Sequence, residues 1–207
     1  MTTWFGTHAQ GDIGTFDHAV APFGRAWICA RSHPARGGPG RDGVLYGASV
    51  TEPTRDLAPN AHRFAPLTPE QAGRWSKFPD ADRVIFPVFI GLEVEEIRTD
   101  YARMRLPYRP DFEQPAGVVH GGAIATLIDT VVVPAVGSAY DVPVAMLTLS
   151  MTLNFIGAVV GEDTVAEGWI ERRGRATVFC RAEARTAKRG LVTSASLVYT
   201  VRPIAGS

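Results

Sequence analysis

Residues 121–136 read GGAIATLIDTVVVPAV, and this stretch decides the fold of the chain. Its apolar residues recur at the i, i+3, i+4, i+7 and i+8 spacing of an α-helix; they are Ile124, Leu127, Ile128, Val131 and Val132. Since the segment is apolar on nearly every side, we expect this helix to be buried. Pro134 should weaken or bend its last turn.

Strand-like runs lie on both sides of this helix in the sequence. Two precede it, at 89–97 and 101–108, and the pair Thr99-Asp100 between them is typical of a turn. After it, residues 147–155 (LTLSMTLNF) alternate apolar and polar side chains. Three more runs follow, at 164–171, 177–186 and 191–202. The order β-β-α-β-β-β-β predicts an α+β fold, in which an antiparallel sheet wraps around one long central helix.

The chain divides into two parts by composition. Residues 1–66 contain four of the five histidines and show little periodicity. We expect an N-terminal extension there, either weakly ordered or docked on the folded domain at 67–207. That domain should open with a short N-terminal helix, because Thr68, Pro69 and Gln71 have the pattern of an N-cap, a first-turn proline and a capping box.

Bulk properties argue against several classes of function. The 207 residues carry 21 basic and 21 acidic side chains, a balance that does not favour a nucleic-acid partner. No apolar run is long enough to cross a bilayer, and the first residues lack the features of a secretory signal, so we expect a cytoplasmic protein without a membrane partner. Cys29 and Cys180 suggest no disulfide framework, and Cys180 is expected in the core.

Asp129 stands in the most apolar part of the expected helix. An unpaired carboxylate is costly to bury there, and no Lys or Arg lies one helical turn away. Two interpretations remain open. The carboxylate is either hydrogen-bonded to a backbone amide or a neighbouring strand, or it acts as a general base or nucleophile.

Gly121 and Gly122 stand at the start of the same helix. The first N–H groups of a helix have no helical partner, and the helix dipole attracts a developing oxyanion to that end, although a turn or cap is the commoner reason for such glycines. From Gly121 to Asp129 is eight residues, or about 12 Å along a helix. One carbonyl group cannot touch both in the same chain, so a site that uses both requires a two-fold symmetric dimer.

The motif His120-Gly121-Gly122, followed nine residues after the histidine by Asp129, resembles the signature of hotdog-fold acyl-CoA thioesterases of the PaaI type. Residues 112–129 look particularly like the thioesterase-superfamily-member branch, and the resemblance continues through 147–155 and 173–175. It covers about residues 67–203. The resemblance implies a hotdog fold and an acyl-CoA thioesterase of fatty acid metabolism, which acts without a cofactor or metal ion as a homodimer or a dimer of dimers.

The same resemblance implies roles for single residues. Asp129 would activate water or attack the thioester carbonyl, which the Gly121 N–H of the partner chain would polarise. Thr148 would hydrogen-bond the carboxylate or the water. His120 and Gly122 would lie at the substrate. CoA would be held by Asn154, Arg173 and Arg175. A solvated strand face is the plainer interpretation of Thr148 and Asn154, and an ordinary charged hairpin that of the two arginines.

Two positions leave their roles open. Many PaaI-type enzymes carry Asn six residues before the histidine, where this chain has Gln114, which has the same amide on a longer stem. We include Gln114 among the catalytic candidates. His120 could act as a base or could shape the entry to the helix.

Three other interpretations fit the sequence less well. A hydratase or dehydratase of the same fold would resemble a pattern of Asp and His five residues apart, or a His-Phe-Pro loop, and we find neither. A non-catalytic acyl-CoA-binding sensor or scaffold would gain little from a buried carboxylate. A metal protein using His8, His18, His33 and His62 would need ligands at a spacing that fits no compact site.

Overall fold

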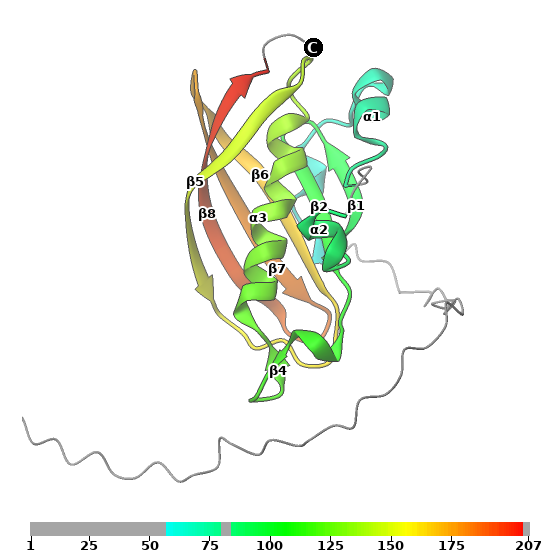
Figure 1. Cartoon of the computed structure of the whole chain (residues 1–207), viewed down its shortest axis with the longest axis vertical. Helices are drawn as coiled ribbons and strands as arrows, with labels where there is room; N and C mark the ends of the chain where they lie inside the picture. The colour runs from blue at the N-terminus through cyan, green and yellow to red at the C-terminus, as the bar shows by residue number, and fades with distance from the viewer. Residues whose placement is uncertain (1–56, 80–83, 205–207) are drawn as a thin grey trace, which may run out of the picture. The chain divides into compact units, whose positions relative to one another are not determined.

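The computed structural model of the chain describes residues 57–79 and 84–204, and all of them belong to one compact unit, Ser49–Ser207. Its helices and strands in chain order are α1 (Pro69–Trp75), α2 (Phe86–Phe89), β1 (Glu93–Arg98), β2 (Tyr101–Leu106), β3 (Glu113–Gln114), β4 (Val118–Val119), α3 (Gly121–Gly137), β5 (Val144–Phe155), β6 (Thr164–Arg173), β7 (Thr177–Thr186) and β8 (Gly190–Pro203). Six strands form one antiparallel sheet in the order β1-β2-β6-β7-β8-β5, and α3 lies across it (Figure 1). The predicted α+β fold is confirmed.

The elements before α3 differ from the prediction in three places, one of which is that β2 ends at Leu106 rather than at residue 108. β1 begins at Glu93 rather than at residue 89, because residues 86–89 form α2 and Gly91, with a φ of 75°, turns the chain out of that helix. The short ladder of β3 and β4, which periodicity does not reveal, closes a tight loop directly before α3. The capping box at the start of α1 is present as predicted, since Thr68 and Gln71 each bond the other's backbone N–H.

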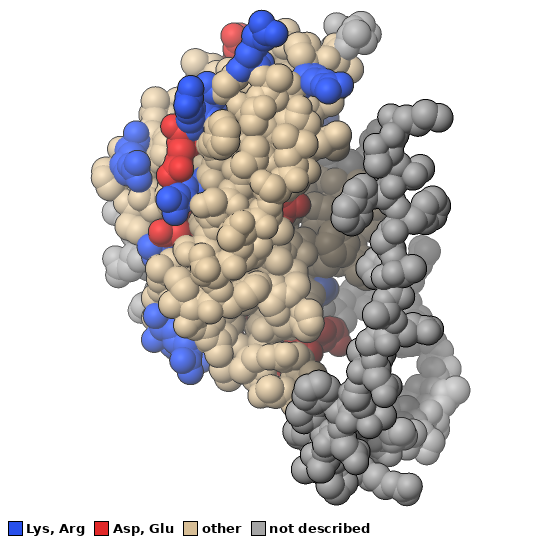
Figure 2. Space-filling model, turned by 90° about the vertical axis from the view of Figure 1, so that its left-hand side faces the viewer, with Lys and Arg blue, Asp and Glu red and all other residues tan. Residues whose placement is uncertain are grey.

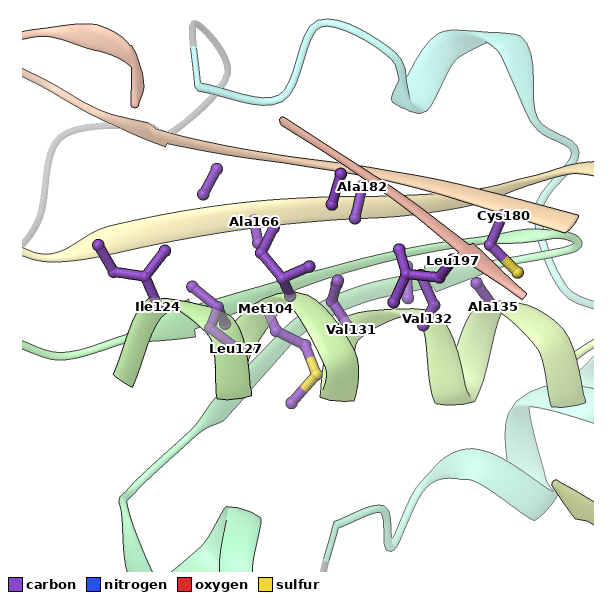
Figure 3. Packing of buried hydrophobic residues seen from close by; sticks show 14 of the residues in the cluster. Met104, Ile124, Leu127, Val131, Val132, Ala135, Ala166, Cys180, Ala182 and Leu197 are labelled. Carbon is purple, nitrogen blue, oxygen red and sulfur yellow. The ribbon is translucent and has the colours of Figure 1, made fainter. Parts of the chain in front are cut away.

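α3 is packed closely on the sheet along most of its length. It runs through Pro134 to Gly137, so the proline does not end the helix. Figure 3 shows side chains of α3, among them Val131, directed toward small sheet residues such as Ala166 and Ala182. At Gly168 of β6, a Cβ would lie 2.8 Å from Val132 Cγ1 and 2.9 Å from Val131 Cγ1. The glycine therefore allows helix and strand to approach this closely.

A β-bulge in β5 determines which of its side chains face α3. The register with β8 shifts directly after Thr148, so the unbroken alternation predicted for this run is wrong. Met146 and Met151 pack against the core, whereas Leu147 and Leu149 are 68% and 60% exposed. The bulge therefore leaves two large apolar side chains on the surface of this strand.

The described part of the expected N-terminal extension, residues 57–66, contacts the sheet face that points away from α3. Glu167 is fully buried there and accepts hydrogen bonds from the backbone and side-chain N–H groups of Asn60, at 2.9 and 3.2 Å. The Tyr101 hydroxyl donates to the same carboxylate at 2.9 Å, and Phe64 stacks on the Tyr101 ring. Residues 57–66 are thus docked on the domain, while residues 1–56 lie outside the described residues.

Candidate active site

Asp129 meets two neighbouring strands from its position in the middle of α3. Its Oδ1 accepts hydrogen bonds from the Thr148 hydroxyl of β5 at 2.9 Å and from the Tyr199 hydroxyl of β8 at 2.6 Å. The Tyr199 oxygen also lies 2.8 Å from the Asp129 backbone oxygen. The carboxylate is half-buried rather than enclosed. No residue in the described part of the chain donates to its Oδ2, which leaves that atom available for chemistry.

Tyr199 is the residue of this site that the sequence analysis missed. It is 2% exposed, and burial, followed by the hydrogen bond to Asp129, raises the pKa of its hydroxyl. The hydroxyl therefore stays protonated and able to donate at neutral pH. A signal was present in the sequence, because Tyr199 is two positions from Leu197 and from Val201, which places it on the same inward, apolar face of β8. A hydroxyl on such a face needs a hydrogen-bond partner.

A cleft of about 520 Å³ lies beside Asp129. Most of its lining is apolar: Phe78, Ile85, Phe86, Pro87, Ala125, Val133, Met146, Leu147 and Met151. Five polar residues complete the lining: Thr126, Asp129, Thr130, Thr148 and Tyr199. A cavity of this size, apolar apart from a few convergent polar groups, is typical of a small-molecule site.

His120 is the N-cap of α3. Its Nδ1 accepts a hydrogen bond from the Gly122 N–H at 2.8 Å, which places the ring proton on Nε2. A Cβ on Gly122 would lie 2.9 Å from that nitrogen, so this cap needs glycine at the second helical position. The contact of both residues with the substrate stays a prediction. His120 shapes the helix entry, and the Gly122 N–H is used by His120.

Gly121 has a free donor at the same end of α3. Its N–H has no acceptor among the residues that the structure describes, and the Phe155 ring lies against it, 3.2 Å from where a Cβ would be. Gly121 and Asp129 lie on one continuous helix, about 12 Å apart along its axis. A single chain does not bring these two groups together, as the spacing predicts.

Gln114 does not approach Asp129 of its own chain. It lies in β3, where its backbone oxygen accepts a hydrogen bond from the Gly117 N–H, and Gly117 turns the chain with a φ of 73°. Its side chain is exposed and does not line the cleft beside Asp129. Its catalytic role therefore stays a prediction that would require a second chain.

The three residues expected to hold CoA have different surroundings. Arg173 donates to the Asp100 carboxylate and, at 3.0 Å, to the Val136 backbone oxygen near the end of α3. Its guanidinium thus holds the C-terminal end of the helix, and its contact with CoA stays a prediction. Asn154 and Arg175 are exposed, and their contact with CoA stays a prediction.

Other candidate groups take no part in this site. In the described ranges no three His, Cys, Asp or Glu side chains gather closely enough to hold a metal ion. Cys180 lies in the core as predicted, and burial raises the pKa of its thiol to about 12. Three of the four histidines considered as metal ligands lie outside the described residues, as does Cys29: they are His8, His18 and His33. No described helix is long and apolar enough to span a bilayer.

The family model "Thioesterase superfamily" matches residues 116–193, which contain the cap of α3, Asp129 and Thr148. Over these residues the chain is similar to the thioesterase superfamily, and its fold is the hotdog fold. A relative in sequence is a Halobacterium salinarum protein provisionally named an esterase, 35% identical over 91 residues. The match covers 42% of this chain and 60% of that relative, so it spans less than two thirds of the relative's length.

Solved structures share the hotdog fold of this chain. A thioesterase from Haemophilus influenzae superimposes with a TM-score of 0.55 at 21% identity, over 58% of this chain and 84% of the other. The PaaI protein from the phenylacetic acid degradation operon of Escherichia coli does so with a TM-score of 0.53 at 16% identity, over 58% and 85%. At these identities the solved structures support the fold alone.

Proposed function

We propose that this hotdog protein hydrolyses acyl-CoA thioesters to a free acid and CoA. One observation carries the proposal: a single carboxylate, Asp129, lines an otherwise apolar cleft and is held there by Thr148 and Tyr199. Such a cleft suits an apolar acyl group, and the oriented carboxylate suits a general base or nucleophile. The superfamily match and the esterase-named relative support hydrolytic chemistry.

The proposed chemistry uses the two oxygens of Asp129 differently. Thr148 and Tyr199 both contact Oδ1, so Oδ2 is left to take a proton from water. The water oxygen bonds to the thioester carbonyl carbon, the C–S bond breaks, and the CoA thiolate leaves with a proton returned from Asp129. Alternatively Oδ2 attacks the carbonyl directly, and water then hydrolyses the resulting acyl anhydride. Both routes yield one carboxylic acid and one thiol.

The oxyanion donor in this proposal comes from a second copy of the chain. β5 pairs with β8 on one side only, has no charged residue, and exposes Leu147 and Leu149. Figure 2 shows a broad surface without Lys, Arg, Asp or Glu on this side of the domain, with charged side chains gathered in a column along its left margin. A long, uncharged, apolar edge strand is a template for pairing with another chain. We infer a homodimer across β5, in which the partner's Gly121 N–H serves Asp129.

The first test measures thiol release from a panel of acyl-CoA thioesters. We expect Asp129→Asn to lower kcat by about 10² or more, because it removes the proton acceptor. Asp111→Asn is the matched control, since Asp111 is an exposed acid in the turn Pro110–Phe112, outside the cleft. Equal rates for wild type and Asp129→Asn would end the proposal. Tight acyl-CoA binding by the wild type without thiol release would favour a non-catalytic binding protein.

The second test asks whether two chains share each site. Gly121→Pro removes the N–H at the first helical position, where proline suits a helix, and His120 already has the extended backbone that a residue before proline adopts. Gly121→Ala is the control, because it adds a Cβ against Phe155 and keeps the N–H. After random reassortment of equal amounts of Gly121→Pro and Asp129→Ala chains, about a quarter of wild-type activity should return, since half the dimers contain one intact site. No recovery, with heterodimers verified, would exclude the shared site.

A further inference from the structure

A second cavity, of about 370 Å³, adjoins the cleft beside Asp129 at the C-terminal end of α3. Phe78 and Met146 line both cavities. Figure 1 shows α1 beside the C-terminal end of α3 and α2 beside its middle, and Trp75 of α1 lies close against Gly137. The two cavities therefore follow one another along α3 and share two lining residues.

The residues along α3 and β5 give the direction and length of this path. Asp129 and Val133 of α3 line the first cavity and Gly137 lines the second, while on β5 Thr148 lines the first and Val144 the second. The eight residues from Asp129 to Gly137 correspond to about 12 Å of helix. An extended chain advances about 1.2 Å per atom, from ~3.6 Å per three-atom residue, so about ten atoms reach from Asp129 to the second cavity.

The lining of the path suits an aliphatic chain. Apart from Asp129, the charged residues that line either cavity are Arg74 and Lys77, both exposed. Arg74 is engaged by Glu70 and by Asp141, so its charge is paired. Met146 is one of the two residues that line both cavities, and its unbranched side chain can change rotamer to let a chain pass.

We propose that the two cavities form one acyl channel, in which aliphatic chains longer than about ten carbons pass Phe78 and Met146 and end in the second cavity. The inference rests on the proposed function, because it places the thioester at Asp129. It assigns the substrate class as long-chain acyl-CoA. Val144 and Met146 become specificity-determining residues, although neither lies at the reacting atoms.

The test compares octanoyl-CoA with tetradecanoyl-CoA in variants that fill one cavity at a time. Val144→Trp fills only the second cavity, so kcat/KM should fall at least tenfold for the tetradecanoyl substrate and less than threefold for the octanoyl one. The expected size follows from about fourfold in binding per buried methylene. Val142→Trp also fills the second cavity from a position that is 57% exposed, which guards against a folding defect in the first variant. Ile85→Trp fills only the first cavity and should lower both rates.

A binding measurement separates failure of the channel from failure of the hydrolase proposal. Calorimetry with octanoate and tetradecanoate reports occupancy of the cavities without any turnover. If the wild type releases no thiol, the hydrolase proposal fails, and selective loss of tetradecanoate binding in Val144→Trp still supports the channel. If Val144→Trp and Val142→Trp weaken both chain lengths equally, or weaken neither, the channel is overturned.

Discussion

Replacing Tyr199 by Phe tests whether orientation of Asp129 matters for turnover. The substitution removes the hydroxyl that contacts Oδ1 at 2.6 Å and keeps the buried ring. A hydrogen bond to a charged group contributes about 1.5–3 kcal/mol, which corresponds to about 10- to 100-fold in rate. Because Asp129 is only partly buried, water replaces part of the lost interaction, and we expect kcat to fall about 10- to 30-fold. KM should change little, since the hydroxyl acts through the carboxylate rather than on the substrate.

The assay is thiol release at saturating acyl-CoA, with Tyr108→Phe as the matched control. The Tyr108 hydroxyl donates to the Glu113 carboxylate at 2.8 Å, outside the residues that line the cleft, so the control loses a similar contact without touching the site. Thr148→Val removes the second donor to Oδ1, and the double variant should lose more than the sum of the single losses, because the carboxylate is then free to rotate. If Tyr199→Phe keeps kcat within threefold while Asp129→Asn loses 10²-fold, Tyr199 has no positioning role.

Three further predictions concern the fold around the site. Gly168→Ala should lower the free energy of unfolding by about 1–3 kcal/mol in urea titrations, because its Cβ would collide with α3. Gly73→Ala, with open space around its Cβ, should instead raise the free energy of unfolding by about 0.5–1 kcal/mol. Equal changes in the two variants would refute the close approach of α3 to Gly168. Burial, with Glu167, raises the pKa of Tyr101 above the ordinary 10.0. The unfolded state therefore loses the phenolic proton at lower pH than the folded state, so the free energy of unfolding should fall as pH rises above 10. In urea titrations against pH, this fall should be less steep in Tyr101→Phe. His120→Ala should cost about 1 kcal/mol of stability through the lost helix cap and leave kcat nearly unchanged, whereas a large loss of kcat at full folding would make His120 catalytic.

Much of the domain follows from patterns within single segments. The apolar periodicity of residues 121–136 predicts α3 to within one residue at its C-terminal end, and the capping box at Thr68 predicts the start of α1. Asp129 stands out because a carboxylate in an apolar helix is costly without a partner, and Gly121 stands out because it opens the same helix within the motif His120-Gly121-Gly122. Each of these features depends only on residues within one short segment, so the sequence of that segment is enough to predict it.

The alternation of apolar and polar residues predicted which segments form strands, but it did not predict their register or the partners of their side chains. The alternation of residues 147–155 identifies β5, but the bulge after Thr148 is set by pairing with β8. Arg173 resembles a charged turn residue, yet its guanidinium bonds Asp100, 73 positions earlier in the chain. A period of two cannot reveal a shift in register, and a charge by itself does not identify its partner.

The sequence by itself determined the helix, the carboxylate in its middle, the free donor at its start and the sheet that covers it. Only the tertiary structure decided that Tyr199 and Thr148 hold the carboxylate, since Tyr199 lies 70 positions from Asp129. The tertiary structure also decided that Asn60 docks the segment before α1 on Glu167, 107 positions away. The physical reason is common to both: hydrogen bonds and cavities form between residues that folding brings together, and no local period encodes which distant residues will meet.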